Sequence, residues 1–247
     1  MAEEKNYRLT LAYDGTRYCG WQRQGNTENT LQAKLETLLT RLLRQSVELH
    51  ASGRTDAGVH ARRQVCSFRA ATAMPTGKMA AEIARFLPED IALVGLEEAD
   101  ARFHARLSCR RKTYLYRLWV SGETELFERR YVVRALENLD MARMREAARL
   151  LEGRHDFSAF TVSRTKKSRV REVEEIRFER TADELRLFFT GNGFLQQMVR
   201  ILTGTLLEVG QGVREPGQMT ALLAEGRRAD AGPAAPARGL TLWDVEY

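Results

Sequence analysis

The segment from His50 to His60 (His-Ala-Ser-Gly-Arg-Thr-Asp-Ala-Gly-Val-His) places a carboxylate and a guanidinium between two glycines. Gly53 precedes Arg54 and Asp56, and Gly58 follows them, which predicts a turn that presents the carboxylate. If the backbone is extended from Arg54 to Asp56, the two side chains share a face and the guanidinium can keep the carboxylate ionised. An ionised, oriented carboxylate can act as a nucleophile or as a base.

The same segment also has a purely structural interpretation. Asp56 would then cap a helix or stabilise a turn, and Arg54 would be an ordinary surface charge. Spacing alone favours this second interpretation. Further motifs are therefore needed to assign a catalytic role.

Positive charge is concentrated in two stretches that contain no acidic residue. Residues 101–122 hold six basic residues and four aromatic ones, the basic ones being Arg102, Arg106, Arg110, Arg111, Lys112 and Arg117. The second stretch comprises Arg164, Lys166, Lys167, Arg169 and Arg171. Such clusters suit the phosphates of a nucleic acid, and nearby aromatic rings can stack on unpaired bases. The alternative is that both stretches are simply solvated surface.

The composition excludes several classes of protein. A chain of 247 residues with 43% hydrophobic residues can bury a core, and its net charge of +6 indicates an anionic partner. The three cysteines, Cys19, Cys66 and Cys109, form no Cys-x-x-Cys pair, which argues against a disulfide framework or a thiolate metal site. No signal-peptide pattern and no long apolar run occurs, so we expect a cytoplasmic protein that is not inserted in a membrane.

Hydrophobic periodicity predicts the elements that position these residues. In the first half, strand-like alternation covers Tyr7 to Tyr13, and leucines at helical spacing follow the candidate N-caps Asn29 and Thr30. Two strands, a second helix that ends before Pro88 and a strand from Ile91 to Leu96 complete a βαββαβ order. The second half repeats this order with the following segments: strand Lys112 to Val120, helix Met141 to Leu151, strands Val170 to Phe178 and Glu184 to Thr190, helix Leu195 to Val209, a short helix near Met219, and strand Leu240 to Tyr247.

We therefore predict an α+β fold made of two ferredoxin-like βαββαβ halves whose mostly antiparallel sheets form a shared catalytic cleft. The predicted domains are 1–105, which carries the Asp56 turn, and 106–247.

The string Gly53-Arg54-Thr55-Asp56-Ala57-Gly58-Val59-His60-Ala61 resembles the signature of the tRNA pseudouridine synthase A family. Further segments that resemble the family occur in order along the whole chain: Tyr13-Asp14-Gly15, Gly20-Trp21-Gln22-Arg23-Gln24, Phe103-His104-Ala105-Arg106, Tyr114-x-Tyr116, Asn192-Gly193-Phe194-Leu195, Met198-Val199-Arg200, Gly204-Thr205-Leu206, Ala235-Pro236, Gly239-Leu240-x-Leu242 and Val245-x-Tyr247.

The resemblance implies a role for each matched residue. Asp56 would be the catalytic nucleophile, and Arg54 and Arg200 would pair with it. Tyr114 would stack on the target base, and Leu240 would line the pocket. Whether Asp56 attacks C1′, adds to C6 or removes the C2′ proton stays open. Without the resemblance, Tyr114 and Leu240 would be ordinary core residues, and Arg200 a solvent-facing arginine.

The resemblance also implies a substrate and an assembly. The expected activity converts uridine to pseudouridine at positions 38, 39 and 40 of the tRNA anticodon stem and loop, in an enzyme that is a homodimer. The expected RNA contacts are Arg110, Arg111, Lys112, Lys166 and Lys167. No metal or nucleotide cofactor is predicted, since the histidines are dispersed and Gly191-Asn192-Gly193 lacks a third glycine. The alternatives are a non-catalytic RNA-binding module and a carboxylate-dependent hydrolase.

Overall fold

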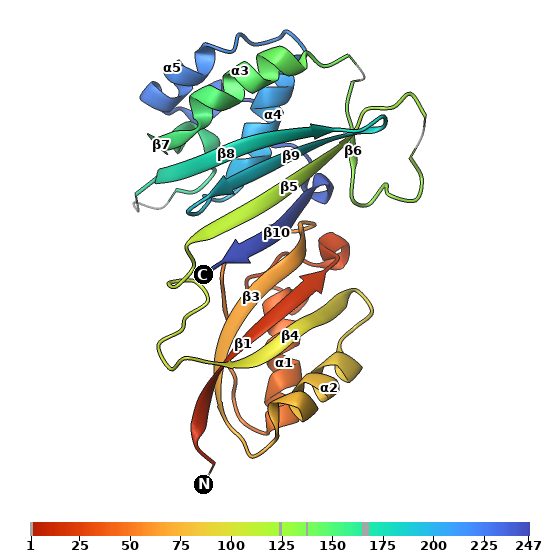
Figure 1. The fold of residues 1–247 in the computed structure, drawn as a ribbon, viewed down its shortest axis with the longest axis vertical. Coiled ribbons are helices and arrows are strands. Elements are labelled where there is room, and N and C mark those ends of the chain that lie inside the picture. Colours follow the sequence, from red (N-terminus) through yellow and green to blue (C-terminus); the bar gives the residue numbers. More distant parts are fainter. Residues whose placement is uncertain (1, 124, 137, 165–167) are drawn as a thin grey trace. The chain divides into compact units, whose positions relative to one another are not determined.

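The computed structural model describes residues 2–123, 125–136, 138–164 and 168–247. The chain divides into two compact units (Figure 1). The first comprises Met1–Arg110 together with Leu242–Tyr247, and the second comprises Arg111–Thr241.

The first unit has the predicted βαββαβ order. Its elements are β1 (Glu4–Tyr13), α1 (Leu31–Leu43), β2 (His50–Ala51), β3 (His60–Ala71), α2 (Thr76–Phe86) and β4 (Ile91–Ala99). The central strand β1 pairs antiparallel with β3 and with β4, and β2 pairs antiparallel with β3. The helix α1 begins where its cap predicts, because Thr30 Oγ1 accepts a hydrogen bond from Ala33 N at 3.3 Å.

The last strand, β10 (Leu240–Glu246), contributes to the first unit from Leu242 onward. There it is the neighbour of β3 in the order β4–β1–β3–β10. The C-terminal end of the chain is hydrogen-bonded to residues 105 and 110 of the same unit. Arg110 N donates to Glu246 O at 2.9 Å, and Tyr247 Oη donates to Ala105 O at 2.7 Å. A division at residue 105 does not anticipate this return of the chain.

The second unit is built on β5 and a long antiparallel pair. Its elements are β5 (Arg111–Trp119), β6 (Val133–Arg134), α3 (Met141–Leu151), β7 (Gly153–Asp156), β8 (Val170–Arg180), β9 (Glu184–Gly191), α4 (Met198–Gly210) and α5 (Gln218–Glu225). The strand order is β5–β9–β8–β7, and the short β6 pairs with β5 in parallel. The two short strands β6 and β7 are not predicted from the sequence.

The helix α4 starts three residues later than hydrophobic spacing predicts. Gln197 has a φ of 59°, in the left-handed region, so it cannot belong to a right-handed helix. Met198 N instead donates to Leu195 O at 3.0 Å, which closes a turn before the helix. Spacing cannot reveal this turn, because Leu195 still fits the apolar stripe.

The α+β class is confirmed, with mostly antiparallel pairing and five α-helices in the described ranges. None of the helices described is long and apolar enough to cross a membrane. The ferredoxin-like classification of the halves and the shared cleft stay predictions.

A buried carboxylate joins two strands of the second unit. Glu184, 6% exposed, accepts hydrogen bonds from Arg117 on β5 and from Arg186 Nε on β9, the latter at 2.7 Å. Arg117 Nη1 also contacts Glu128 Oε2 at 2.7 Å. Burial by itself would raise the pKa of Glu184, but the two arginines outweigh it and hold that pKa below its ordinary value.

This arrangement predicts a pH-dependent contribution to stability. We expect Glu184→Gln to lower the free energy of unfolding by about 1–3 kcal/mol at pH 7. Because the folded pKa is depressed, the stabilisation is complete above the unfolded pKa of about 4.3 and is lost as the pH falls through the folded pKa. Denaturant titrations from pH 7 to about pH 3 should therefore show the gap to the parent protein closing. The exposed pair of Arg177 and Glu179 supplies the control, since Glu179→Gln should change stability by less than about 1 kcal/mol.

Candidate functional site

Asp56 lies on the tight turn that leads into β3. Val59 N donates to Asp56 O at 3.1 Å, and Gly58, the third residue of this turn, has a φ of 76°. That conformation favours glycine, so the turn itself explains why residue 58 is a glycine. The Asp56 side chain is half-buried, whereas Arg54 is exposed. The predicted turn is confirmed, and the pairing of Arg54 with Asp56 stays a prediction.

A buried hydrogen-bond network holds the residues just before Asp56. Thr55 Oγ1 and the Tyr13 hydroxyl are 2.8 Å apart. Gln64 Nε2 donates to Gly53 O at 2.9 Å and to Tyr13 Oη at 3.4 Å, and Gln64 Oε1 accepts from Ser52 Oγ at 2.7 Å. A fully buried glutamine in a strand must be satisfied in this way. Sequence reasoning missed Gln64, because only its position opposite the loop reveals its role.

Removing the Tyr13 hydroxyl should loosen the Asp56 turn. We expect Tyr13→Phe to lower the free energy of unfolding by about 1–3 kcal/mol, because it leaves buried polar groups of Thr55 and Gln64 short of a partner. Amide hydrogen exchange at residues 55–59 should accelerate. Tyr7→Phe on the same strand is the control: Tyr7 is equally buried, and in the described ranges its hydroxyl makes no hydrogen bond. Equal effects of the two substitutions would contradict a specific role for this network.

The segment from Asp14 to Trp21 contacts the turn at both of its ends. Trp21 N donates to Thr55 O at 3.0 Å. At Gly20, with a φ of 90°, an added Cβ would lie 2.9 Å from Thr55 O and 3.2 Å from the Asp56 carbonyl carbon. At Gly15, a Cβ would lie 2.0 Å from Val59 O. Only glycine permits this close approach of two backbones.

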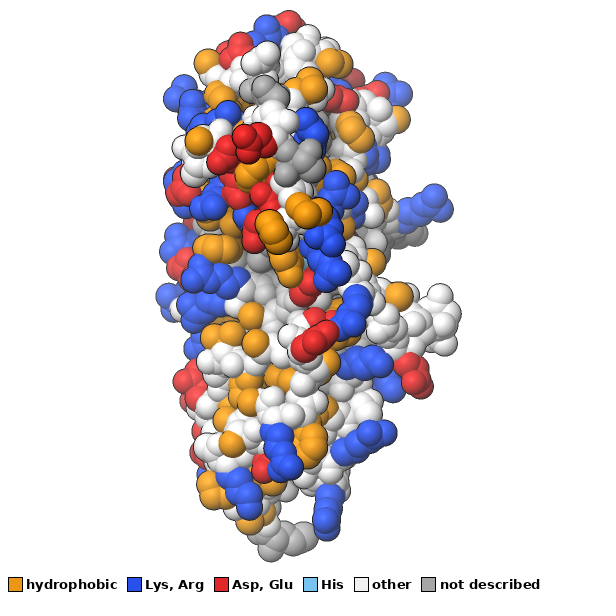
Figure 2. Space-filling model, turned by 90° about the vertical axis from the view of Figure 1, so that its right-hand side faces the viewer, with side chains coloured by type: hydrophobic (Ala, Val, Ile, Leu, Met, Phe, Trp, Pro, Cys, Tyr) orange, Lys and Arg blue, Asp and Glu red, His pale blue; other side chains and the backbone are white. Residues whose placement is uncertain are grey.

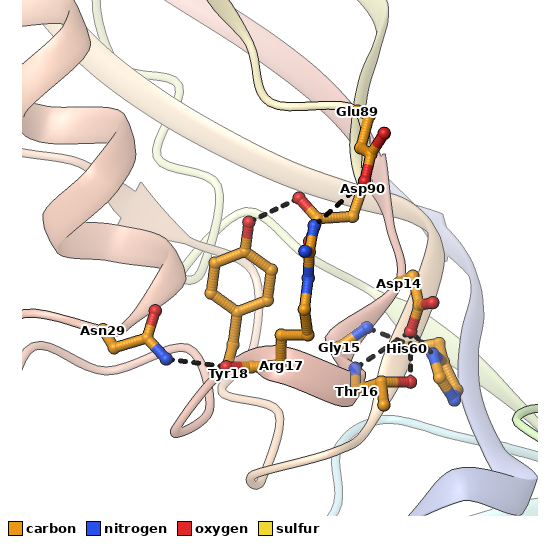
Figure 3. A network of polar contacts seen from close by, with 9 residues as sticks. All are labelled: Asp14, Gly15, Thr16, Arg17, Tyr18, Asn29, His60, Glu89 and Asp90. Atoms are coloured by element: carbon orange, nitrogen blue, oxygen red, sulfur yellow. Dashed lines mark hydrogen bonds and ion pairs between the residues drawn. The ribbon is translucent and has the colours of Figure 1, made fainter.

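A second polar network fixes the Asp14–Tyr18 part of this segment (Figure 3). Arg17 Nε and Nη2 donate to Asp90 Oδ2 at 3.0 and 2.9 Å, and Tyr18 Oη donates to Asp90 Oδ1 at 2.6 Å. Asp14 N donates to Asp90 O at 2.9 Å, and Asn29 Nδ2 donates to Arg17 O at 2.6 Å. Burial and the bond to Asp90 raise the pKa of Tyr18, so this hydroxyl stays protonated at neutral pH.

In the second unit, Tyr114 and Tyr116 occupy neighbouring same-face positions on β5. Tyr114 is 7% exposed and meets Phe194 edge-on, with ring centroids 5.2 Å apart. Tyr116 is fully buried, and its hydroxyl donates to Pro236 O at 2.7 Å. Tyr116 is therefore a core residue with a satisfied hydroxyl. A role for Tyr114 toward a substrate base stays a prediction.

Arg200 is half-buried in the first turn of α4, not a solvent-facing arginine. Its Nε donates to Ala235 O at 2.7 Å, and Ala235 N donates to Arg200 O at 3.0 Å. The helix approaches this segment closely because Gly204 has no side chain: a Cβ there would lie 1.8 Å from Pro233 O. Leu240, at the start of β10, is 5% exposed. The interaction of Arg200 with Asp56 stays a prediction.

The predicted RNA contacts differ in their surroundings. Arg110 is exposed, Lys112 is half-buried, and Arg111 Nη1 forms an ion pair with Glu174 Oε2 at 3.2 Å. Lys166 and Lys167 lie outside the described residues. Figure 2 shows Lys and Arg side chains spread over the face that it presents, with Asp and Glu side chains among them.

Comparisons with known proteins place these residues in a family context. The family model described as tRNA pseudouridine synthase matches residues 10–107 and 147–247. The tRNA pseudouridine synthase A 2 of Bacillus cereus is 40% identical over 243 residues, which are 98% of this chain and 99% of the relative. The tRNA pseudouridine synthase A of Brevibacillus brevis is 41% identical over 98% of this chain and 100% of the relative. That of Geobacillus kaustophilus is 42% identical over 97% of this chain and 93% of the relative.

Proposed function

This chain belongs to the tRNA pseudouridine synthase family, and we propose that it isomerises uridine to pseudouridine in tRNA with Asp56 as its catalytic nucleophile. The observation that carries the proposal is the position of Asp56. It is a half-buried carboxylate on a turn whose two ends are fixed by Trp21 and by Gly15. A carboxylate held in this way loses little freedom when it meets a reacting atom.

The reaction explains why a carboxylate is needed. The C1′–N1 glycosidic bond breaks, the uracil turns in its pocket, and C5 bonds to C1′. The C5 proton then leaves, and N1 takes up a proton. The product is an isomer of the substrate, so the conversion has no net oxidation or reduction. An anion close to C1′ can trap or stabilise the sugar cation that develops as the base departs. Of the residues described, Asp56 is our candidate for that anion.

The other site residues take the roles that the family resemblance assigns. Arg54 and Arg200 would keep the Asp56 carboxylate ionised, because a nearby positive charge favours the charged form. Tyr114 would stack on the base, and Leu240 would give the pocket an apolar wall. Arg54 is exposed, so its side chain is accessible to RNA.

The proposed substrate is the anticodon stem and loop, at positions 38, 39 and 40. A base in a stem must be flipped out of its stack, which costs roughly a few kcal/mol. We infer that Arg110, Arg111, Lys112, Lys166 and Lys167 help to offset that cost through contacts with the RNA backbone. We also propose a homodimer that acts in the cytoplasm.

Tritium release from C5 tests the proposed activity directly. A transcribed tRNA carrying C5-tritiated uridine at positions 38–40 should release tritium to water, because C5 loses its hydrogen as the new bond forms. A matched transcript with cytidine at those positions is the control. A non-catalytic RNA-binding module would bind both transcripts and release no tritium, and that result would overturn the proposed function.

A further inference from the structure

His60 is a buried titratable residue that the proposed reaction does not use. It is the first residue of β3, directly after the Asp56–Val59 turn, and is 3% exposed. Its imidazole faces the Asp14 turn (Figure 3). Gly15 N donates to His60 Nδ1 at 3.1 Å, and Asp14 Oδ1 lies 3.1 Å from the same nitrogen.

The bond from Gly15 indicates which imidazole nitrogen carries the proton. A backbone N–H can only donate, so Nδ1 must offer a lone pair, and the proton of the neutral ring is then on Nε2. Asp14 Oδ1 lies 3.1 Å from Nδ1 and favours a proton there, but it also accepts hydrogen bonds from Thr16 N and Thr16 Oγ1, so the carboxylate is already hydrogen-bonded when Nδ1 is unprotonated. Protonation of Nδ1 would replace the Gly15 bond by a bond to Asp14.

Gly15 links the imidazole to the Asp56 turn. Its Cα lies so close to Val59 that a Cβ would be 2.0 Å from Val59 O. Val59 in turn closes the turn by donating its N–H to Asp56 O. A shift of Gly15 would therefore be transmitted through Val59 to the backbone of Asp56.

We propose that His60 is a positioning residue for the Asp56 turn: its neutral imidazole, through Nδ1, fixes Gly15 and so fixes the backbone that presents the carboxylate. The inference rests on the proposed function, since it concerns the same site. His60 acts through Gly15 and Val59 and does not touch the substrate. It should affect the chemical step far more than tRNA binding, because a misplacement of about 1 Å can reduce turnover by about 100-fold.

Two substitutions separate this role from simple core packing. His60→Leu fills similar volume without an acceptor, and we expect it to lower kcat by about 10- to 100-fold while the Kd for tRNA changes less than about threefold. His60→Asn places an amide oxygen near the position of Nδ1, so it should recover much of the lost kcat. Unchanged kcat in His60→Leu would overturn the proposal. Equal losses in both variants, accompanied by lost tRNA binding, would overturn it as well.

A measurement on the parent protein covers the case in which His60→Leu does not fold. The ¹⁵N chemical shifts of the His60 imidazole, at the pH where the enzyme is active, should identify Nδ1 as unprotonated and Nε2 as protonated. A proton on Nδ1 would overturn the proposal. The proposed function fails separately, because it requires the parent protein itself to release tritium from tRNA.

Discussion

Asp56→Asn is expected to abolish pseudouridine formation while tRNA binding and folding persist. Asparagine has nearly the same shape, and its backbone carbonyl oxygen at position 56 can still accept the hydrogen bond from Val59 N, but its side chain carries no negative charge to stabilise or trap C1′. Loss of a residue in a covalent catalytic group typically lowers kcat by about 10⁴-fold or more. The effect should therefore appear in tritium release under single-turnover conditions, with the Kd for tRNA measured on the same preparation.

A control for this substitution is Asp100→Asn in the same unit. Asp100 is exposed, and its Oδ1 accepts a hydrogen bond from Arg102 N, a contact that an amide oxygen can also make. Asp100→Asn should leave turnover unchanged. If Asp56→Asn instead lost tRNA binding and thermal stability together, Asp56 would be a structural turn residue, which is the interpretation that spacing alone favours.

Local signals in the sequence predict the elements of this protein well. Thr30 marks the start of α1, and α3 has the predicted bounds because Asp140 caps it and Gly153 follows it with a φ of 102°. Where a backbone conformation overrides the hydrophobic stripe, as at Gln197, the prediction fails. The return of Leu242–Tyr247 to the first unit depends on partners far away in the sequence, such as Ala105, and no local pattern encodes it.

The same distinction applies to the candidate site. The residues around Asp56 predict its turn, but nothing local separates a catalytic carboxylate from a cap, and only the resemblance gave it a role. The groups that hold the turn, including Gly15, Gly20 and Gln64, come from other segments. Gly15 and Gly20 belong to segments that resemble the family. Only the distances to the backbone of the Asp56 turn explain why these two positions must be glycine.

Gly20→Ala is expected to damage both stability and activity without touching a catalytic side chain. Gly20 has a φ of 90°, which an L side chain rarely adopts, and an added Cβ would lie 2.9 Å from Thr55 O and 3.1 Å from Ala57 N. The alanine must therefore push back the backbone on both sides of Asp56. We expect a loss of about 2–4 kcal/mol in the free energy of unfolding. In the fraction that folds, kcat should fall by about 100-fold, because the carboxylate is displaced.

The chain supplies a close control for this prediction in Gly25→Ala. Gly25 lies five residues further along the same loop, and an added Cβ there meets nothing within 4 Å. Its stability should change by less than about 0.5 kcal/mol, with kcat unaffected. Denaturant titration gives the first quantity, and single-turnover tritium release on samples confirmed as folded gives the second. If Gly20→Ala matched Gly25→Ala in both measurements, the close contact with residues 55–57 would not position Asp56.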